Sequence, residues 1–412
     1  MLRSLCLSVC LLAGSARAAS VLVAGADAAS ESTYDRLLDT LRGAGHDVAL
    51  RSVDAAAAEL RQDGRRFEHL VFFASASKQV PPELSPLNLA RRIEAGTNLV
   101  LIVSPDSAEP WRDFAREFEV DFGSRGQQVI DHFGHDASDS GSHTVLSVSL
   151  ASAPAPFVSD ATRRGRNVVY SGAGHVSGQH PQLVSVLHAS STASSADAGG
   201  SHVVADVSET SSGMSLVSAF QARNNARVAF VGSTDVFADR FLDRGDELGN
   251  AAFARDLLAW VFHQTGQLRL VKSRYNAPGL LNAQPTYRVG TQLDVEFTIS
   301  SDSPYNADDL QLEFGMLDPH LRLDIPMQSQ SQDTATFATR FTIPDRHGVF
   351  TLRLDHRRPG WTAVEHKETI AVTPMHHDEY ERFIGGAFPY YAGAASVSAA
   401  FLLFAGLWSL QS

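Results

Sequence analysis

"HLVFFASASKQVPPELSPLNLARRIEAGTNLVLIVS", residues 69–104, decides the fold of the first half of the chain. Both ends of this stretch are short runs that are apolar throughout, and the segment LNLARRIEAG between them has the pattern of a helix ending near Gly96. Strands that are apolar on both faces and alternate with helices are typical of a parallel sheet covered on both sides. We therefore predict a strand–helix–strand unit here.

The same alternation extends in both directions along the chain. Upstream, SVLVAG and HDVALRS are predicted strands, and Tyr34, Leu37, Leu38 and Leu41 give the helix between them one apolar face. Downstream, RVAFVG is a further buried strand, followed by a helix that ends near Gln264. We predict a doubly wound α/β domain over residues 19–265, with an irregular Ser-rich segment near 185–212.

After about residue 266 the helical pattern stops. Five stretches alternate apolar and polar residues and are separated by Pro, Gly and Asp turns: TQLDVEFTIS, DLQLEF, ATFATRFTIP, GVFTLRLDH and KETIAVTP. Short alternating strands at this spacing indicate a β-sandwich. We predict a β-sandwich-like domain over 266–375 and a juxtamembrane segment over 376–386.

The C-terminal stretch from Ile384 to Ser412 contains no Asp, Glu, Lys, Arg or His. It is long enough to cross a hydrocarbon core, and aromatic residues flank it on both sides, as is typical of membrane interfaces. We predict a transmembrane helix over 387–410 with a short cytosolic tail, 411–412. Two alternatives remain open: a buried core helix, and a glycolipid-anchor signal, although the polar spacer that such a signal needs is missing.

The N-terminus has the features of a cleaved secretory signal over residues 1–18. Arg3 precedes an apolar stretch, and Ala16-Arg17-Ala18 forms a small-x-small cleavage site. A cleaved signal with one C-terminal span predicts a single-pass type I protein with both domains in the lumen or outside the cell. Both cysteines, Cys6 and Cys10, lie in this signal, which excludes thiol catalysis and thiolate metal sites from the mature chain.

Catalytic signals in the chain are weak. The net charge of −12 argues against nucleic-acid binding, and none of the turns after the first strands is a glycine-rich phosphate loop. Asp131, His132, His135, Asp136 and His143 are close together in sequence and are a candidate metal site, although their spacing matches no known motif. A lumenal or cell-surface hydrolase using Asp131, His132 and His135 is therefore one alternative, and a carbohydrate-binding module using Trp361 is another.

Several longer stretches of the chain are distinctive. They are VIDHFGHDASDSGSHT, FQARNNARVAFVGSTDVFADRF, QLEFGMLDPHLR, IPDRHGVFTLRLDHRRPGW and HDEYERFIGGAFPYYAGAASV, in this order. Together they resemble the single-span 48 kDa accessory subunit family of oligosaccharyltransferase, the wheat-germ-agglutinin-binding type. The resemblance runs from the first strand to the final span, but the Ser-rich segment does not align, and the tail lacks the lysine-based retrieval signal of some members.

The resemblance implies a non-catalytic scaffold in an endoplasmic-reticulum complex that transfers a preassembled glycan from dolichyl diphosphate to asparagine. It implies a multi-spanning catalytic subunit and other accessory subunits as partners, besides membrane lipid. It also implies that the complex uses a divalent metal in the catalytic subunit, with no cofactor, metal or catalytic residue in this chain. Since small residues let helices approach closely in lipid, we predict that Gly393, Ala395 and Ala399 pack against partner helices.

Overall fold

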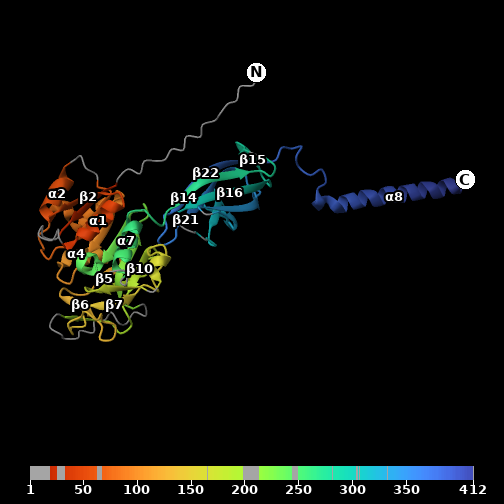
Figure 1. Cartoon of the computed structure of the whole chain (residues 1–412). Coiled ribbons are helices and arrows are strands. Elements are labelled where there is room, and N and C mark those ends of the chain that lie inside the picture. The colour runs from red at the N-terminus through yellow and green to blue at the C-terminus, as the bar shows by residue number, and fades with distance from the viewer. Residues whose placement is uncertain are drawn as a thin grey trace, which may run out of the picture.

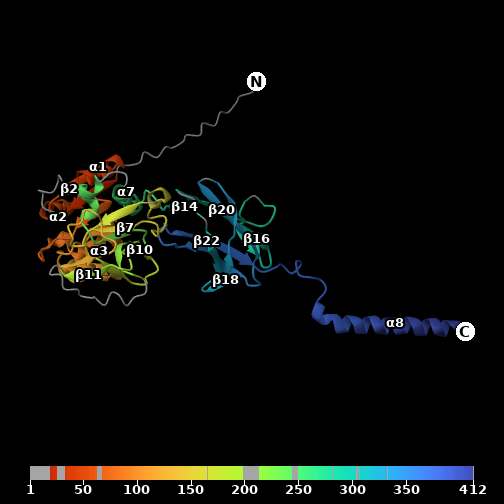
Figure 2. The same ribbon diagram turned by 60° about the horizontal axis from the view of Figure 1, so that its bottom comes forward.

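The computed structural model describes residues 19–25, 33–62, 67–164, 166–197, 213–243, 249–280, 282–302, 305, 307–331 and 333–411. The predicted signal peptide and residues 198–212 of the Ser-rich segment lie outside the described residues. Figures 1 and 2 show an α/β domain, a smaller β-domain beside it, and one long helix leading away from the β-domain. This is the order of parts predicted from the sequence.

The α/β domain is built on a nine-stranded sheet in which the neighbouring strands β2-β1-β3-β4-β13 are all parallel. Their bounds are Ser20–Ala24 (β1), Asp47–Arg51 (β2), His69–Phe73 (β3), Asn98–Ile102 (β4) and Arg227–Val231 (β13). The predicted parallel sheet is confirmed. Strand β1 lies between β2 and β3, so the direction of winding changes at β1.

Alternate residues of these strands face opposite layers of helices. Val21 and Val23 of β1 join one apolar cluster, whereas Leu22 and Ala24 join another. The first cluster contains the buried faces of α1 (Asp35–Gly43) and α7 (Asn250–Val261), and the second contains those of α2 (Val53–Arg61), α3 (Pro86–Glu94) and α4 (Glu109–Arg116). Because the sheet is covered on both faces, β3, β4 and β13 have no exposed position, which explains their continuous apolar runs.

The region between α4 and β13 contains more strands than the sequence indicates. They are β5 (Val120–Phe122), β6 (Gln127–Ile130), β7 (Leu146–Ser149), β8 (Asn167–Tyr170), β9 (His175–Ser177), β10 (Leu183–His188), β11 (Ser194–Asp197) and β12 (Ser215–Gln221). Strands β12, β9, β5 and β10 extend the main sheet in antiparallel pairing. Strands β10 and β11 therefore give regular structure to the first part of segment 185–212, which the sequence predicts to be irregular.

Serine hydroxyls explain how this polar stretch forms a sheet. The hydroxyl of Ser185 donates to Ser215 Oγ at 2.7 Å, and Ser218 Oγ lies 2.7 Å from His175 Nε2 and 2.8 Å from Ser177 Oγ. Because these polar groups bond one another across the strands, the edge of the sheet buries most of them as paired groups; His175 Nδ1 is a buried atom without a hydrogen-bond partner among the described residues. Amino-acid composition alone does not reveal that these serines pair across strands. Two short helices, α5 (Asp160–Arg163) and α6 (Asp239–Leu242), and two 3-10 turns, Pro82–Leu84 and Asp235–Phe237, complete the domain.

The β-domain consists of two sheets with one apolar cluster between them, as predicted for a β-sandwich. One sheet has the order β14-β16-β20-β19, with bounds Leu268–Asn276, Gln292–Ser301, Thr334–Thr342 and Met327–Gln330. The other has the order β15-β22-β21-β17-β18, with bounds Thr286–Arg288, Val364–Thr373, Gly348–His356, Gln311–Gly315 and Pro319–Asp324. The sequence pattern predicts β16, β17, β20, β21 and β22 but misses the other four strands. Strands β14 and β19 lie at sheet edges; β14 has only its two end residues buried and β19 is mostly exposed, so their alternation is weak.

Candidate functional site

Helix α8, Phe388–Leu410, follows the 3-10 turn Gly385–Ala387 and has none of its residues buried. Its 23 residues span about 35 Å at ~1.5 Å per residue, enough for a hydrocarbon core of about 30 Å. Within the described part of the chain, Gly385–Leu410 is the one helix long and apolar enough to cross a membrane. The alternative of a buried core helix is wrong, because α8 lies clear of both domains (Figure 1).

Three small residues of α8 share one side of the helix. At about 100° per residue, Ala395, Ala399 and Gly406 fall within about 40° of one another. Leu402 lies on this side as well, about 20° from Ala395 and about 60° from Ala399, while Val397, Phe401, Phe404 and Trp408 occupy the opposite side. Gly393 lies about 120–160° from Ala399 and Ala395 on the same geometry. Two of the three residues predicted to contact partner helices therefore share a face, and Gly393 belongs to the bulky side.

The segment between the β-sandwich and α8 is tied back onto the β-sandwich at its start. Arg288 donates to Thr373 Oγ1 at 3.0 Å and to the carbonyl oxygen of Pro374 at 3.2 Å. The same guanidinium forms a 3.4 Å ion pair with Glu379. The chain is thus held as far as Glu379, and only residues 380–387 separate this anchor from the first residue of α8.

At its other end the β-sandwich is joined to the α/β domain by Arg227, the first residue of β13. The buried guanidinium donates to the carbonyl oxygens of Trp260, Thr265 and Gly266 at 2.6–2.7 Å. It also lies 4.7 Å from the centre of the Trp260 ring. Burial lowers the pKa of Arg227 to about 9, so the side chain remains a cation at neutral pH.

Polar groups around Arg227 connect the two domains directly. Gln221 donates to the carbonyl oxygen of Trp361 at 2.7 Å, and the backbone N–H of Ala363 donates to Asn225 Oδ1 at 2.8 Å. Gly360 has a φ of +84° and packs closely on Pro156. The sequence analysis did not identify this junction; its one visible signal is an arginine at the start of an otherwise apolar strand.

The carboxyl end of β4 is occupied by the protein itself. The guanidinium of Arg112 is buried and donates to the carbonyl oxygens of Ser104, Pro105, Ser107 and Gly123. At the carboxyl end of β1, which is separated from β4 by β3, Gly25 has a φ of +107°, and a Cβ on it would lie 2.5 Å from the carbonyl oxygen of Phe73. The Arg112 side chain thus fills the turn after β4 with hydrogen bonds to its backbone carbonyl groups.

The candidate metal cluster is held together as a loop. Asp131 accepts hydrogen bonds from the Ser190 hydroxyl, from Thr192 Oγ1 at 2.8 Å and from the backbone N–H of Phe133 at 2.9 Å. Burial opposes ionisation of Asp131, but these hydrogen bonds outweigh it and lower the pKa of the carboxyl. The carboxylate therefore already has partners.

The remaining members of the cluster follow the same pattern. Asp136 accepts from the backbone N–H of Ser138 at 2.9 Å, and the rings of His132 and His135 stack edge-on against His143, with centroids 4.8 and 4.6 Å apart. Across the described ranges, no group of three or more His, Cys, Asp or Glu side chains has a geometry that could hold a metal ion. The arrangement gives no support to a hydrolase built on these residues.

Trp361, the candidate carbohydrate-binding residue, lies at the domain junction. Its ring packs on Tyr305, with centroids 4.9 Å apart, and borders a cavity of about 390 Å³. The α/β domain contributes most of the other lining residues, including Pro156, Val158 and Asp256. The ring is thus part of the packing between the domains.

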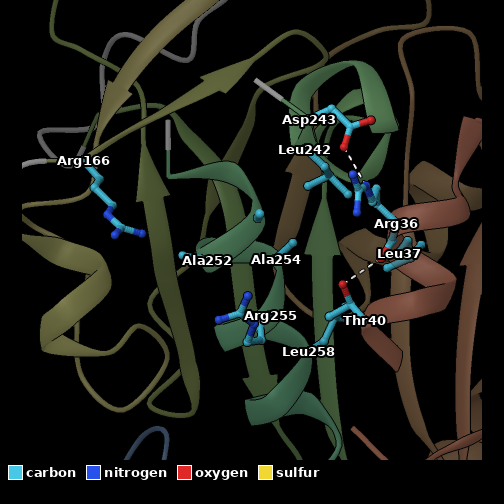
Figure 3. Close-up of a pocket in the computed structure, with 11 residues that line it drawn as sticks. Arg36, Leu37, Thr40, Arg166, Leu242, Asp243, Ala252, Ala254, Arg255 and Leu258 are labelled. Carbon is cyan, nitrogen blue, oxygen red and sulfur yellow. Dashed lines mark hydrogen bonds and ion pairs between the residues drawn. The ribbon is translucent and has the colours of Figure 1, made fainter. Parts of the chain in front are cut away.

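A second cavity, of about 530 Å³, lies between α1, α6 and α7 (Figure 3). Its lining includes Arg36, Arg166 and Arg255, and Arg36 forms a 2.6 Å ion pair with Asp243. Neither Arg166 nor Arg255 has an ion pair with any residue that the structure describes. The described lining thus combines three cationic side chains with the Thr40 hydroxyl and the paired carboxylate of Asp243.

Comparison with known proteins covers nearly the whole chain. Residues 12–264 match the family model described as OST48, N-terminal domain, and residues 277–412 match the OST48 middle domain. A Schizosaccharomyces pombe protein named dolichyl-diphosphooligosaccharide–protein glycosyltransferase subunit wbp1 is 32% identical over 425 residues, covering 99% of this chain and 95% of the relative. The 48 kDa subunits of the same glycosyltransferase from Caenorhabditis elegans and Arabidopsis thaliana are 31% and 30% identical, covering 93% of this chain and 89% and 91% of those proteins.

Solved structures add nothing to this assignment. A Niemann-Pick type C2 protein from Japanese carpenter ant covers 26% of this chain with 6% identity and a TM-score of 0.20, too low to support an argument. The two family matches together include the α/β domain, the β-sandwich except β14, and α8. On the strength of these matches, the chain belongs to the OST48 family.

Proposed function

We propose that the chain is a non-catalytic accessory subunit of the oligosaccharyltransferase complex. That complex transfers a preassembled glycan from dolichyl diphosphate to the asparagine of Asn-x-Ser/Thr in nascent proteins. The observation that carries the proposal is the similarity, over nearly the full length, to proteins named as subunits of this glycosyltransferase in a fungus, an animal and a plant. The chain contributes to the assembly and stability of the complex.

The geometry supports a role in holding partners rather than in chemistry. The carboxylates of the candidate cluster and the turn after β4 use their polar groups in internal hydrogen bonds. We assign no cofactor to this chain and place the divalent metal of the reaction in a separate, multi-spanning catalytic subunit. Other accessory subunits of the complex and membrane lipid are its remaining partners, and it does not bind nucleic acid.

The chain is a single-pass membrane protein, and α8 is its attachment to the membrane. We assign it to the endoplasmic reticulum in type I orientation, with both domains in the lumen and retention by assembly with its partners. In lipid, helices associate through close packing of small residues. The face of α8 containing Ala395, Ala399 and Gly406 supports docking on a partner helix, and the bulky face supports contact with lipid.

The test is a mild-detergent purification of the full chain through a tag after Ser412. We expect a multi-spanning glycosyltransferase subunit to co-purify, and the eluate to glycosylate an acceptor peptide containing Asn-x-Thr from a dolichyl-diphosphate donor. After the partners are stripped with a harsher detergent, this chain alone should have no such activity. Purification of the chain without any partner, or activity that stays with the chain alone, would refute the proposal.

A further inference from the structure

The two ends of the β-sandwich differ in character. The end that includes Gly266 and Trp361 is joined to the α/β domain. The opposite end includes the last residues of β22, from which the chain runs to α8. In the strand register, Gly348 of β21 pairs with Val372 of β22, and Gly315 of β17 pairs with Thr351 of β21. The β17–β18 turn therefore lies at the same end of the β-sandwich as the exit toward the membrane.

This end carries exposed apolar side chains. Leu317, in the β17–β18 turn, is 100% exposed, Val349 is 63% exposed and Met316 is 45% exposed. We call these three residues the apolar tip. Met316 contacts the start of β21, because a Cβ on Gly348 would lie 3.0 Å from its Sδ. Among the described residues, Leu317 is the most exposed of the large apolar side chains, and water is an unfavourable environment for such a group.

The connection to α8 limits how far the apolar tip can move from the membrane. Arg288 holds the chain through Glu379, and the eight residues 380–387 that follow extend to at most about 29 Å. Three of these eight are exposed apolar or aromatic residues, namely Tyr380, Phe383 and Ile384. Such side chains partition into the membrane interface, which shortens the tether further. The apolar tip is thus kept close to the surface of the membrane that α8 spans.

The charges around the apolar tip do not favour an anionic or a cationic partner. Asp318 and Asp345 flank it together with Arg346; His347 precedes β21, and His320 lies at the start of β18. A surface with mixed charge and a protruding leucine is suited to apolar insertion between zwitterionic headgroups. It is not the cluster of basic residues that anionic lipids attract.

We propose that the apolar tip inserts into the headgroup region of the membrane that α8 spans, on the side where both domains lie. The β-sandwich then rests on the bilayer at two points, the tether before α8 and the β17–β18 turn, which orients the rigidly joined α/β domain above the surface. This inference rests on the membrane attachment of the chain and holds whichever complex it joins. The occupant is lipid, and a protein partner at the same surface is the competing result.

The experiment uses the full chain with Cys6 and Cys10 replaced by serine, so that one new cysteine carries an environment-sensitive fluorophore. The test variant is Leu317→Cys, and the matched control is Val271→Cys, an apolar residue of the same β-sandwich that is 62% exposed and lies near its other end. Both are placed in phosphatidylcholine nanodiscs with and without headgroup-labelled nitroxide lipid. We expect blue-shifted emission and at least about threefold stronger quenching at residue 317 than at residue 271.

Equal emission and equal quenching at the two positions would overturn the proposal. Shielding of residue 317 that arises only when partner subunits are added, and not in lipid alone, would also overturn it, because the tip would then contact protein. A Leu317→Ser variant checks the fold. Since the side chain is fully exposed, its thermal unfolding should match that of the unmodified chain, and its membrane attachment through α8 should persist.

Discussion

The indole N–H of Trp260, in the α/β domain, donates a 2.8 Å hydrogen bond to the carbonyl oxygen of Gly360, in the β-sandwich. The guanidinium of Arg227 lies against the same ring and donates to the carbonyl oxygen of Gly266, at the start of the β-sandwich. The carbonyl oxygens of Gly360 and Gly266 thus accept hydrogen bonds from side chains of the α/β domain. This makes the two domains one structural unit, as a scaffold requires.

Replacing Arg227 by methionine should strongly destabilise this unit. The substitution leaves several buried carbonyl oxygens without a donor, and we expect a loss of about 3–5 kcal/mol in the free energy of unfolding. Tryptophan fluorescence during denaturant unfolding measures the effect. Arg223→Met, at an exposed position of the same β12–β13 turn, should change stability by less than about 0.5 kcal/mol. Equal effects of the two variants would show that Arg227 is not the link.

The close approach of the domains at Gly360 can be tested with a matched pair of glycines. Gly360 and Gly279 both have a φ of +84°, but a Cβ on Gly360 would lie 2.6 Å from Pro156 Cδ, whereas a Cβ on Gly279 would meet nothing within 4 Å. Both alanine variants incur backbone strain of about 1–2 kcal/mol. Gly360→Ala should cost about 1–3 kcal/mol more, because the clash is added. Thermal unfolding of the two variants measures the difference, and identical melting temperatures would argue against tight packing at this junction.

The free energy of unfolding should fall as the pH drops below 6.5. Burial lowers the pKa of His175 from 6.5 to about 3, with a smaller contribution from His188. Between these two values the unfolded chain binds a proton that the folded chain does not, so acid favours unfolding. The expected loss from His175 is about 1.4 kcal/mol between pH 7.5 and pH 5.5.

The measurement is the denaturation midpoint at both pH values. His175→Gln, which retains a donor toward Ser218, should remove about 1.4 kcal/mol of the pH dependence. The exposed His347→Gln is the control. Equal pH dependence of stability in His175→Gln and in the unmodified chain would show that His175 is not the group responsible for the loss of stability in acid.

Enlarging a residue of α8 should weaken assembly with partner subunits only on the face that contains Ala395 and Ala399. Ala399→Leu places a bulky side chain where a partner helix is proposed to pack, and it should weaken assembly by about 1–3 kcal/mol, or roughly five- to 150-fold. Val397→Leu, on the opposite face, should have little effect. The recovery of partner subunits on native gels compares the two. An equal loss in both variants would place the contact elsewhere or show that α8 is generally sensitive to substitution.

The sequence predicts the parallel sheet well because β3 and β4 are buried on both faces and therefore have no polar positions. It predicts α8 for a related reason, since no charged residue interrupts it. It does not predict β10, because its half-buried Ser185 bonds a partner distant in sequence, Ser215, and it does not predict β11. The Arg227 junction is hidden in the same way, because its carbonyl partners lie up to 133 positions away.

The most direct test of the central claim replaces Phe388–Leu410 with a polyleucine span of the same length, which keeps membrane attachment but removes the face of small residues. The quantity to measure is the ratio of the multi-spanning catalytic subunit to this chain in a mild-detergent eluate. The account predicts that this ratio falls severalfold while the chain remains in the membrane and folded. An unchanged ratio would contradict it and would show that α8 anchors the chain without selecting its partners.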